Sequence, residues 1–227
     1  MLSGVVVEET IRRHVTHIGY VTYVAFLAIV ALWVSRFDVP AAAWPSLVGL
    51  LAIITGSGPI GPEFSSGTLQ LILVKPIRRV TYLLSRVAGV VGVIWIAAIV
   101  AFLVEVIGRM LRGSVPFASM ATTLLHTAAM AVLTVALLTL FGSLTRAYLN
   151  AAIYVVLSIA LGALPPMLAN RYPDVARALM FVEQNLFPSP PPALSGKWLL
   201  LVFSNALVAL VLACLAFRRR EVPYGAD

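Results

Sequence analysis

The sequence predicts an all-α membrane protein with six transmembrane helices. Hydrophobic residues make up 61% of the 227 residues, charged residues only 11%, and the mean hydropathy is +1.00. A water-soluble domain of this length cannot bury so much apolar surface, so the bilayer must cover much of it. The apolar stretches are continuous rather than alternating, which favours helices over the strands of a membrane barrel.

Six intervals without Lys, Arg, Asp or Glu give the expected number of spans. Each interval is about long enough for a helix to cross a hydrocarbon core of roughly 30 Å. We expect a single transmembrane domain over 1–227, with spans at about 18–35, 41–60, 86–108, 117–144, 149–168 and 198–217. The second span is the least regular, because several Pro and Gly residues lie in it or close to its ends.

The basic residues indicate the orientation. If six spans leave both termini in the cytosol, ten Lys and Arg residues lie inside and six outside, as positively charged loops prefer. The inside set is Arg12, Arg13, Lys75, Arg78, Arg79, Arg86, Arg146, Arg218, Arg219 and Arg220, and the outside set is Arg36, Arg109, Arg112, Arg171, Arg177 and Lys197. Topology and contact with anionic membrane lipid explain the pI near 10.1, and no nucleic acid partner is needed.

Two further helices are expected outside the spans. Apolar residues recur at helical spacing from Val7 to Ile18, so we expect an amphipathic helix over 4–17 that lies on the inner membrane surface or extends the first span into the cytosol. The external connection 169–197 has apolar residues at helical spacing from Val175 to Leu186, before a Pro-rich stretch that must end any helix. It forms either a short amphipathic helix at the outer interface or a packed loop.

Candidate metal ligands are few. The single Cys214 lies within the last span, and no zinc or iron–sulfur spacing occurs. His14 and His17 could share a helix face, but no third ligand lies nearby. His126 lies at membrane depth, where we expect a neutral, hydrogen-bonded side chain facing the bundle interior rather than a metal ligand or a proton relay. We expect no metal or cofactor in this chain.

Other polar side chains within the spans are candidates for the pathway or for contacts between helices. Glu105 is the only acid inside a span, and Arg109 four residues later predicts a local ion pair rather than a substrate-binding carboxylate. Asn150 and Asn205 suit hydrogen bonds between helices. Otherwise the spans suggest a mostly aliphatic interior, which is compatible with a lipid-like or amphipathic cargo but equally with a dry, closed dimer interface.

Enzymatic signatures are weak. Gly142-Ser143 offers the nucleophile of an intramembrane serine protease, but no His follows His126, so the last two spans carry no base. No phosphate-binding G-x-x-x-x-G-K-[ST] loop occurs, so the chain is not itself expected to hydrolyse ATP.

A polar, basic segment at 61–85 separates the second and third spans. Its ordered motif is Glu63-Phe64, Gly67-Thr68-Leu69, Pro76-Ile77-Arg78-Arg79 and Tyr82-Leu83-Leu84-Ser85-Arg86. This motif resembles the one found in permease subunits of type-2 ATP-binding-cassette (ABC) exporters. Arg78 departs from the pattern, since Ser often follows the Pro-hydrophobic pair.

The resemblance implies a coupling helix within 61–85 that docks on a separate ATPase subunit. Glu63, Phe64, Gly67, Thr68 and Leu69 would lie at that contact, and Pro76 and Arg79 would shape the return into the membrane. Helix 4–17 would be the family's elbow helix.

The same resemblance implies an assembly in the bacterial cytoplasmic (inner) membrane. Two permease copies, identical or homologous, would pair with two ATPase subunits, which bind ATP and Mg; this chain would bind neither. The expected function is ATP-driven export. The alternatives are a membrane anchor of an ABC-ATPase-driven gliding, secretion or regulatory machine and an integral-membrane enzyme.

Overall fold

The computed structural model describes residues 2–37, 43–57, 79–113, 115–145 and 149–219. These residues form eight helices and no strand. The helices are α1 (Gly4–Val15), α2 (Ile18–Phe37), α3 (Ala43–Gly56), α6 (Arg79–Met110), α7 (Phe117–Leu144), α8 (Leu149–Leu168), α9 (Pro173–Leu186) and α10 (Gly196–Arg219). The predicted all-α class is confirmed.

Five of these helices are long and apolar enough to cross a bilayer, namely α2, α6, α7, α8 and α10. The chain is therefore an integral membrane protein. Helix α3 is apolar but has only 14 residues, which span about 21 Å at 1.5 Å per residue. Helices α7 and α8 have the bounds expected for the fourth and fifth spans, whereas α6 begins at Arg79 rather than at 86 and takes in the end of segment 61–85.

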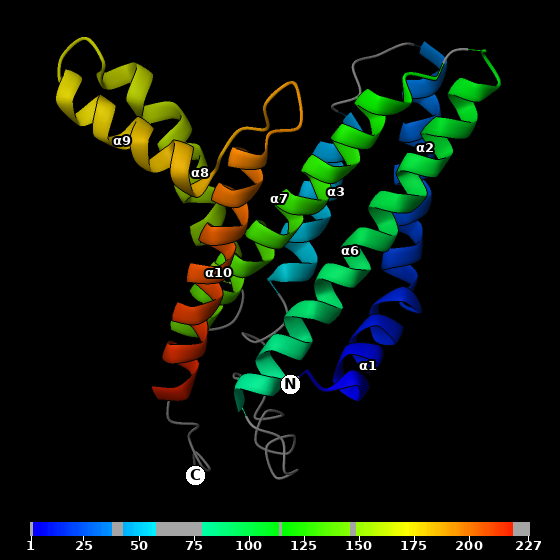
Figure 1. Cartoon of the computed structure of the whole chain (residues 1–227). Coiled ribbons are helices and arrows are strands. Elements are labelled where there is room, and N and C mark those ends of the chain that lie inside the picture. The colour runs from blue at the N-terminus through cyan, green and yellow to red at the C-terminus, as the bar shows by residue number, and fades with distance from the viewer. Residues whose placement is uncertain (1, 38–42, 58–78, 114, 146–148, 220–227) are drawn as a thin grey trace.

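The long helices and α3 alternate in direction along the chain (Figure 1). One end of the bundle carries α1, the start of α6 and the end of α10, and α3 runs toward this end. The opposite end carries α9, which packs against α8. Helix α7 lies at the centre, since it packs against α3, α6, α8 and α10.

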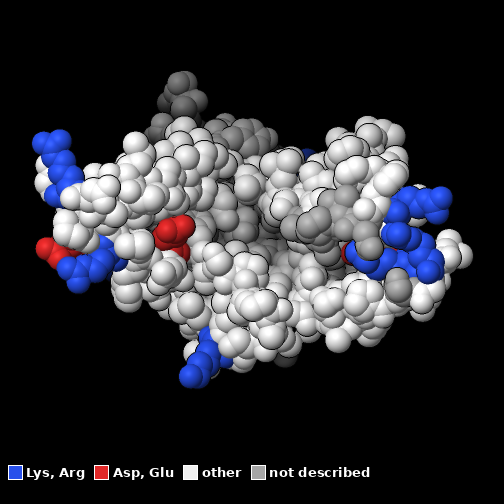
Figure 2. All heavy atoms as spheres, turned by 90° about the horizontal axis from the view of Figure 1, so that it is seen from above, with Lys and Arg blue, Asp and Glu red and all other residues white. Residues whose placement is uncertain are grey.

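The described basic residues divide equally between the two ends. Arg12, Arg13, Arg79, Arg86, Arg218 and Arg219 belong to the α1 end, and Arg36, Arg109, Arg112, Arg171, Arg177 and Lys197 to the α9 end. The excess expected on the cytosolic side rests on Lys75, Arg78, Arg146 and Arg220, which lie outside the described residues. Figure 2 looks onto the α9 end, where basic side chains gather toward the edges and a hollow lies near the middle.

Candidate functional site

Most residues of the expected ATPase contact lie outside the described part of the chain. These are Glu63, Phe64, Gly67, Thr68, Leu69 and Pro76. Arg79 is the first residue of α6. The segment is flanked by Ser57, just after α3, and by Arg79, the first residue of α6, and α3 runs toward the end of the bundle where α6 begins (Figure 1).

Helix α1 packs against the first half of α6 through a buried polar contact. Nη1 of Arg86 donates a hydrogen bond to Oγ1 of Thr10 at 3.0 Å, and Thr10 is fully buried. A Cβ on Gly89 would lie 2.6 Å from Cβ of Thr10, so the close approach of the two helices requires glycine here. The backbone N–H of Ser3 also donates to Oγ of Ser85 at 2.7 Å. Sequence reasoning missed this contact, because it treated Arg86 only as part of the basic motif.

His14 lies on the same side of α1. Its Nδ1 is 2.8 Å from the carbonyl oxygen of Thr10. Burial lowers the pKa of His14 below its usual 6.5, the hydrogen bond to Thr10 opposes this, and the charges of Arg86, Arg13 and His17 add to the lowering. The side chain therefore favours its neutral form next to α6.

Glu105 belongs to a closed cluster between α3 and α6. Nε of Arg109 donates to its Oε1 at 2.8 Å, so the ion pair that the sequence predicts is present. Nε1 of Trp44 donates to Oε2 at 2.7 Å. Glu105 is only 1% exposed, and both its oxygens are occupied. This arrangement leaves the carboxylate unavailable to a substrate, and it locks α3 to α6.

The two asparagines join helices. Nδ2 of Asn150 donates to the carbonyl oxygens of Ser57 and Leu138 at 3.1 and 3.2 Å, which ties the start of α8 to α7 and to the end of α3. Asn150 is 1% exposed. Nδ2 of Asn205 on α10 donates to the backbone carbonyl of Asn185 on α9.

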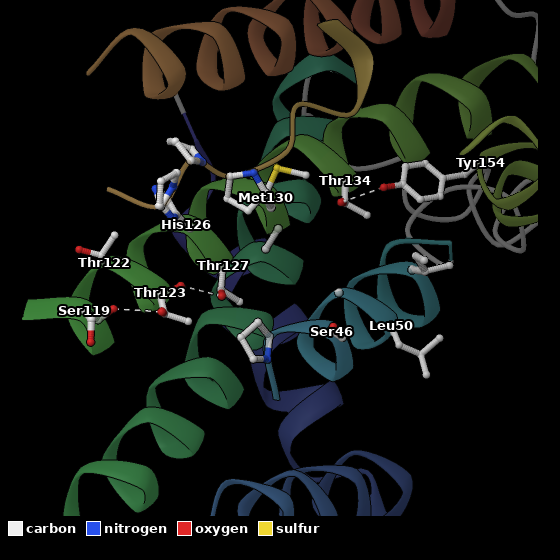
Figure 3. Close-up of a pocket in the computed structure, with 17 residues that line it drawn as sticks. Ser46, Leu50, Ser119, Thr122, Thr123, His126, Thr127, Met130, Thr134 and Tyr154 are labelled. Carbon is white, nitrogen blue, oxygen red and sulfur yellow. Dashed lines mark hydrogen bonds between the residues drawn. The ribbon is translucent and has the colours of Figure 1, made fainter. Parts of the chain in front are cut away.

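A cavity of about 860 Å³ opens between α3, α7 and α8, next to residues 190–192 (Figure 3). His126 on α7 lines it and is 7% exposed. Its ring meets that of Trp198 edge to face, with centroids 4.7 Å apart. Nε2 of His126 is buried and has no hydrogen-bond partner among the described residues. The hydrogen-bonded state expected from the sequence is therefore absent at this atom.

Side-chain hydroxyls follow one another along the α7 side of the cavity (Figure 3). Ser119, Thr122, Thr123 and Thr127 donate to the carbonyl oxygens of Pro116, Ala118, Ser119 and Thr123 at 3.0, 2.8, 3.0 and 2.7 Å. Farther along, the hydroxyls of Thr134 and Tyr154 are 3.2 Å apart. The interior is thus more polar here than the mostly aliphatic one expected, and the Ser/Thr spacing in 119–127 was the signal in the sequence.

The histidine and serine considered for a protease lie far apart. His126 and Ser143 belong to the same helix, α7, and a rise of 1.5 Å per residue separates them by about 25 Å along its axis. Oγ of Ser143 donates to the carbonyl oxygen of Leu140 at 2.7 Å. These two residues form no nucleophile–base pair. Within the described ranges there is also no group of three His, Cys, Asp or Glu residues that could hold a metal ion.

Residues 42–223 match a family of proteins of unknown function, DUF2705. The chain belongs to the DUF2705 family. No curated protein matches its sequence. The DUF2705 region includes the helices from α3 to α10, and with them the cavity and the Glu105 cluster, whereas α1 and α2 precede it.

Proposed function

We propose that this chain is the permease subunit of an ABC exporter, which forms the transmembrane pathway and is driven by a separate ATPase subunit. The observation that carries the proposal is the ordered motif from Glu63 to Arg86, which resembles that of type-2 ABC permeases. It begins after α3 and ends in the first turns of α6. Each residue of the motif is common in membrane proteins. Their order, at this place between two apolar helices, is what favours the ABC assignment.

The arrangement of the helices supports this proposal. If α3 crosses the bilayer together with residues that flank it, the chain has six spans and both termini on one side. The start of α6, α1 and the end of α10 share one end of the bundle, and α3 runs toward it (Figure 1). An ATPase docked there would meet segment 61–85 in the cytosol, below the bacterial cytoplasmic membrane.

Helix α1 would be the elbow helix. Its contact with α6 would let a movement of α6 be transmitted to α1. A force on segment 61–85 would reach α6 at Arg79. The bond from Arg86 to Thr10 and the close approach at Gly89 would carry α1 along with α6. Closure of two ATPase subunits on ATP and Mg would then shift two permease copies, or one copy and a homologue, between inward-open and outward-open states.

The proposal is tested by purifying tagged chain from its own membranes with and without the charge reversal Glu63→Arg. We expect wild type to copurify with an ATPase that carries a phosphate-binding loop, and both Glu63→Arg and deletion of 64–70 to abolish that association and the linked ATP hydrolysis. Asp174→Arg, which reverses an exposed charge at the opposite end of the bundle, should retain both. Full ATP hydrolysis in a Glu63→Arg complex would overturn the proposed docking site.

A transport assay with the purified complex in lipid vesicles distinguishes export from the two alternative functions. An exporter complex should move a solute or lipid across the bilayer in an ATP-dependent manner. Hydrolysis with no movement of any solute or lipid would instead support a membrane anchor in an ABC-driven machine. Chemical turnover by the isolated chain would support an integral-membrane enzyme.

A further inference from the structure

We propose that the cavity between α3, α7 and α8 binds an uncharged amphipathic molecule whose polar part donates hydrogen bonds to α7. The inference that a molecule binds here depends only on the cavity and the residues that line it. That the bound molecule is the cargo of the exporter rests on the proposed function.

The hydroxyls on α7 determine which polar groups fit. A hydroxyl has one proton to donate and can accept through its oxygen lone pairs. Ser119, Thr123 and Thr127 have committed their protons to backbone carbonyls of their own helix. Their oxygens can therefore only accept, so a ligand that bonds to this row must bring its own N–H or O–H donors.

His126 adds a polar group that needs a partner. Buried imidazole nitrogens are normally hydrogen-bonded, yet Nε2 of His126 has no partner among the described residues. The edge-to-face contact with Trp198 holds the ring at the cavity wall. A ligand beside the ring, or the small rearrangement that its binding produces, would supply the missing hydrogen bond.

The opposite wall determines the rest of the ligand. Leu50 and Ile53 of α3 give the cavity an apolar side, to which Met130 of α7 adds, and no Lys, Arg, Asp or Glu lines it among the residues that the structure describes. A charged ligand would lose its hydration without gaining an ion pair, which is costly. The volume of about 860 Å³ falls in the range of small-molecule sites, roughly 300–1,000 Å³. The fit is an uncharged headgroup with hydroxyls and an apolar body.

The test uses the full chain in phosphatidylcholine nanodiscs, without any ATPase. The probe is a monoacylglycerol with a photoactivatable diazirine in its acyl chain, because its glycerol headgroup is uncharged and carries two hydroxyl donors. We expect labelling of peptides from α3 and α7 that saturates and is displaced by unlabelled monoacylglycerol. A fatty acid and a fatty amine with the same chain and diazirine should label these peptides much less.

Matched variants locate the site. Thr123→Val/Thr127→Val keeps side-chain shape but removes two acceptors, and should weaken binding about tenfold. Thr139→Val removes a buried α7 hydroxyl outside the cavity and should bind as wild type. Met130→Trp, which fills the cavity and leaves the hydroxyls in place, should abolish saturable labelling, so the conclusion does not depend on one variant folding well.

Three results would overturn the proposal. They are labelling that does not saturate, equal or stronger saturable labelling by the charged probes, and wild-type labelling of the Thr123→Val/Thr127→Val and Met130→Trp variants. Because no ATPase is present, these results are independent of whether Glu63→Arg breaks an ATPase complex.

Discussion

Two polar regions lie within the membrane-spanning part of this protein, and they differ in how their polar atoms are used. In the cluster of Glu105, Arg109 and Trp44, both carboxylate oxygens have a donor, and the cluster joins α3 to α6. In the α7 cavity, Nε2 of His126 has no partner among the described residues and the neighbouring hydroxyl oxygens keep accepting capacity. The first region is closed to any ligand, while the second offers one a place to bind.

This contrast changes which buried polar residue of the membrane helices is the best functional candidate. An acid at membrane depth is ordinarily the first functional candidate, and Glu105 is the only acid in the five apolar helices that the structure describes as long enough to span a membrane. Its hydrogen bonds to Trp44 and Arg109 give Glu105 a structural role, because they join α3 to α6. The less conspicuous row of Ser and Thr beside His126 is the better candidate for recognition, because the hydroxyl oxygens can still accept hydrogen bonds and Nε2 of His126 has no partner among the described residues.

The largest effect is expected from breaking the satisfied cluster. Glu105→Leu removes the carboxylate that Nε of Arg109 and Nε1 of Trp44 contact, and the Arg109 side chain is only 12% exposed. Losing one member of a buried pair costs about 3–5 kcal/mol, which should appear as lower unfolding free energy in a denaturant titration of the detergent-solubilised protein.

The double variant Glu105→Leu/Arg109→Leu is the control for that prediction. It removes both charges, so much of the stability should return. If Glu105→Leu alone unfolds like wild type, the cluster does not hold α3 to α6, and the distinction between the two regions fails.

The second prediction has the opposite sign and concerns the cavity. His126→Phe removes a ring nitrogen that lacks a partner but keeps an aromatic ring against Trp198. We expect a gain of about 1 kcal/mol in unfolding free energy without ligand. Excess monoacylglycerol should stabilise wild type and reduce this advantage.

Thr139→Val is a suitable comparison for His126→Phe, because the Thr139 hydroxyl is already bonded to the carbonyl oxygen of Val135. It should change stability by less than His126→Phe, and monoacylglycerol should stabilise it as much as it stabilises wild type. A loss of stability in His126→Phe would show that the imidazole has a partner in the folded protein and would remove it from the proposed site.

The sequence predicted correctly those features that depend on residues close together along the chain, such as helix bounds and contacts within one helix. Charge-free intervals gave the bounds of α7 and α8, because hydropathy alone determines where such helices lie. The Glu105–Arg109 pair followed from a spacing of one helical turn. Trp44, the third member of that cluster, could not be found this way, since its place beside Glu105 depends on how α3 packs on α6.

The start of α6 and the docking of α1 were missed for a related reason. The charges of Arg79 and Arg86 favour a membrane span that begins near 86, but α6 begins at Arg79, and Arg86 turns inward to Thr10 instead of toward solvent. The two residues are 76 positions apart. Only the glycine at 89, which permits the close approach, hints at this contact in the sequence.

The smallest effect is expected at His14. Like Glu105 it has a hydrogen-bond partner, but its environment suits only one of its two protonation states. Its Nδ1 is bonded to the Thr10 carbonyl, so the neutral ring is satisfied, but burial beside Arg86 disfavours its charged form and lowers its pKa. Below pH 6.5 the undocked helix takes up a proton more readily than the docked one. The docking of α1 should therefore weaken as the pH falls below 6.5 and recover as the pH rises.

Amide hydrogen exchange of α1 measures this, after correction for the intrinsic pH dependence of exchange. Wild type should lose protection over 4–15 between pH 7.5 and 5.5, whereas His14→Gln, which cannot be charged, should keep most of its protection over that interval. Equal loss in both proteins would assign the acid sensitivity to another group. His17, exposed next to the helix, is the nearest one to substitute, because its charge contributes to the lowered pKa of His14.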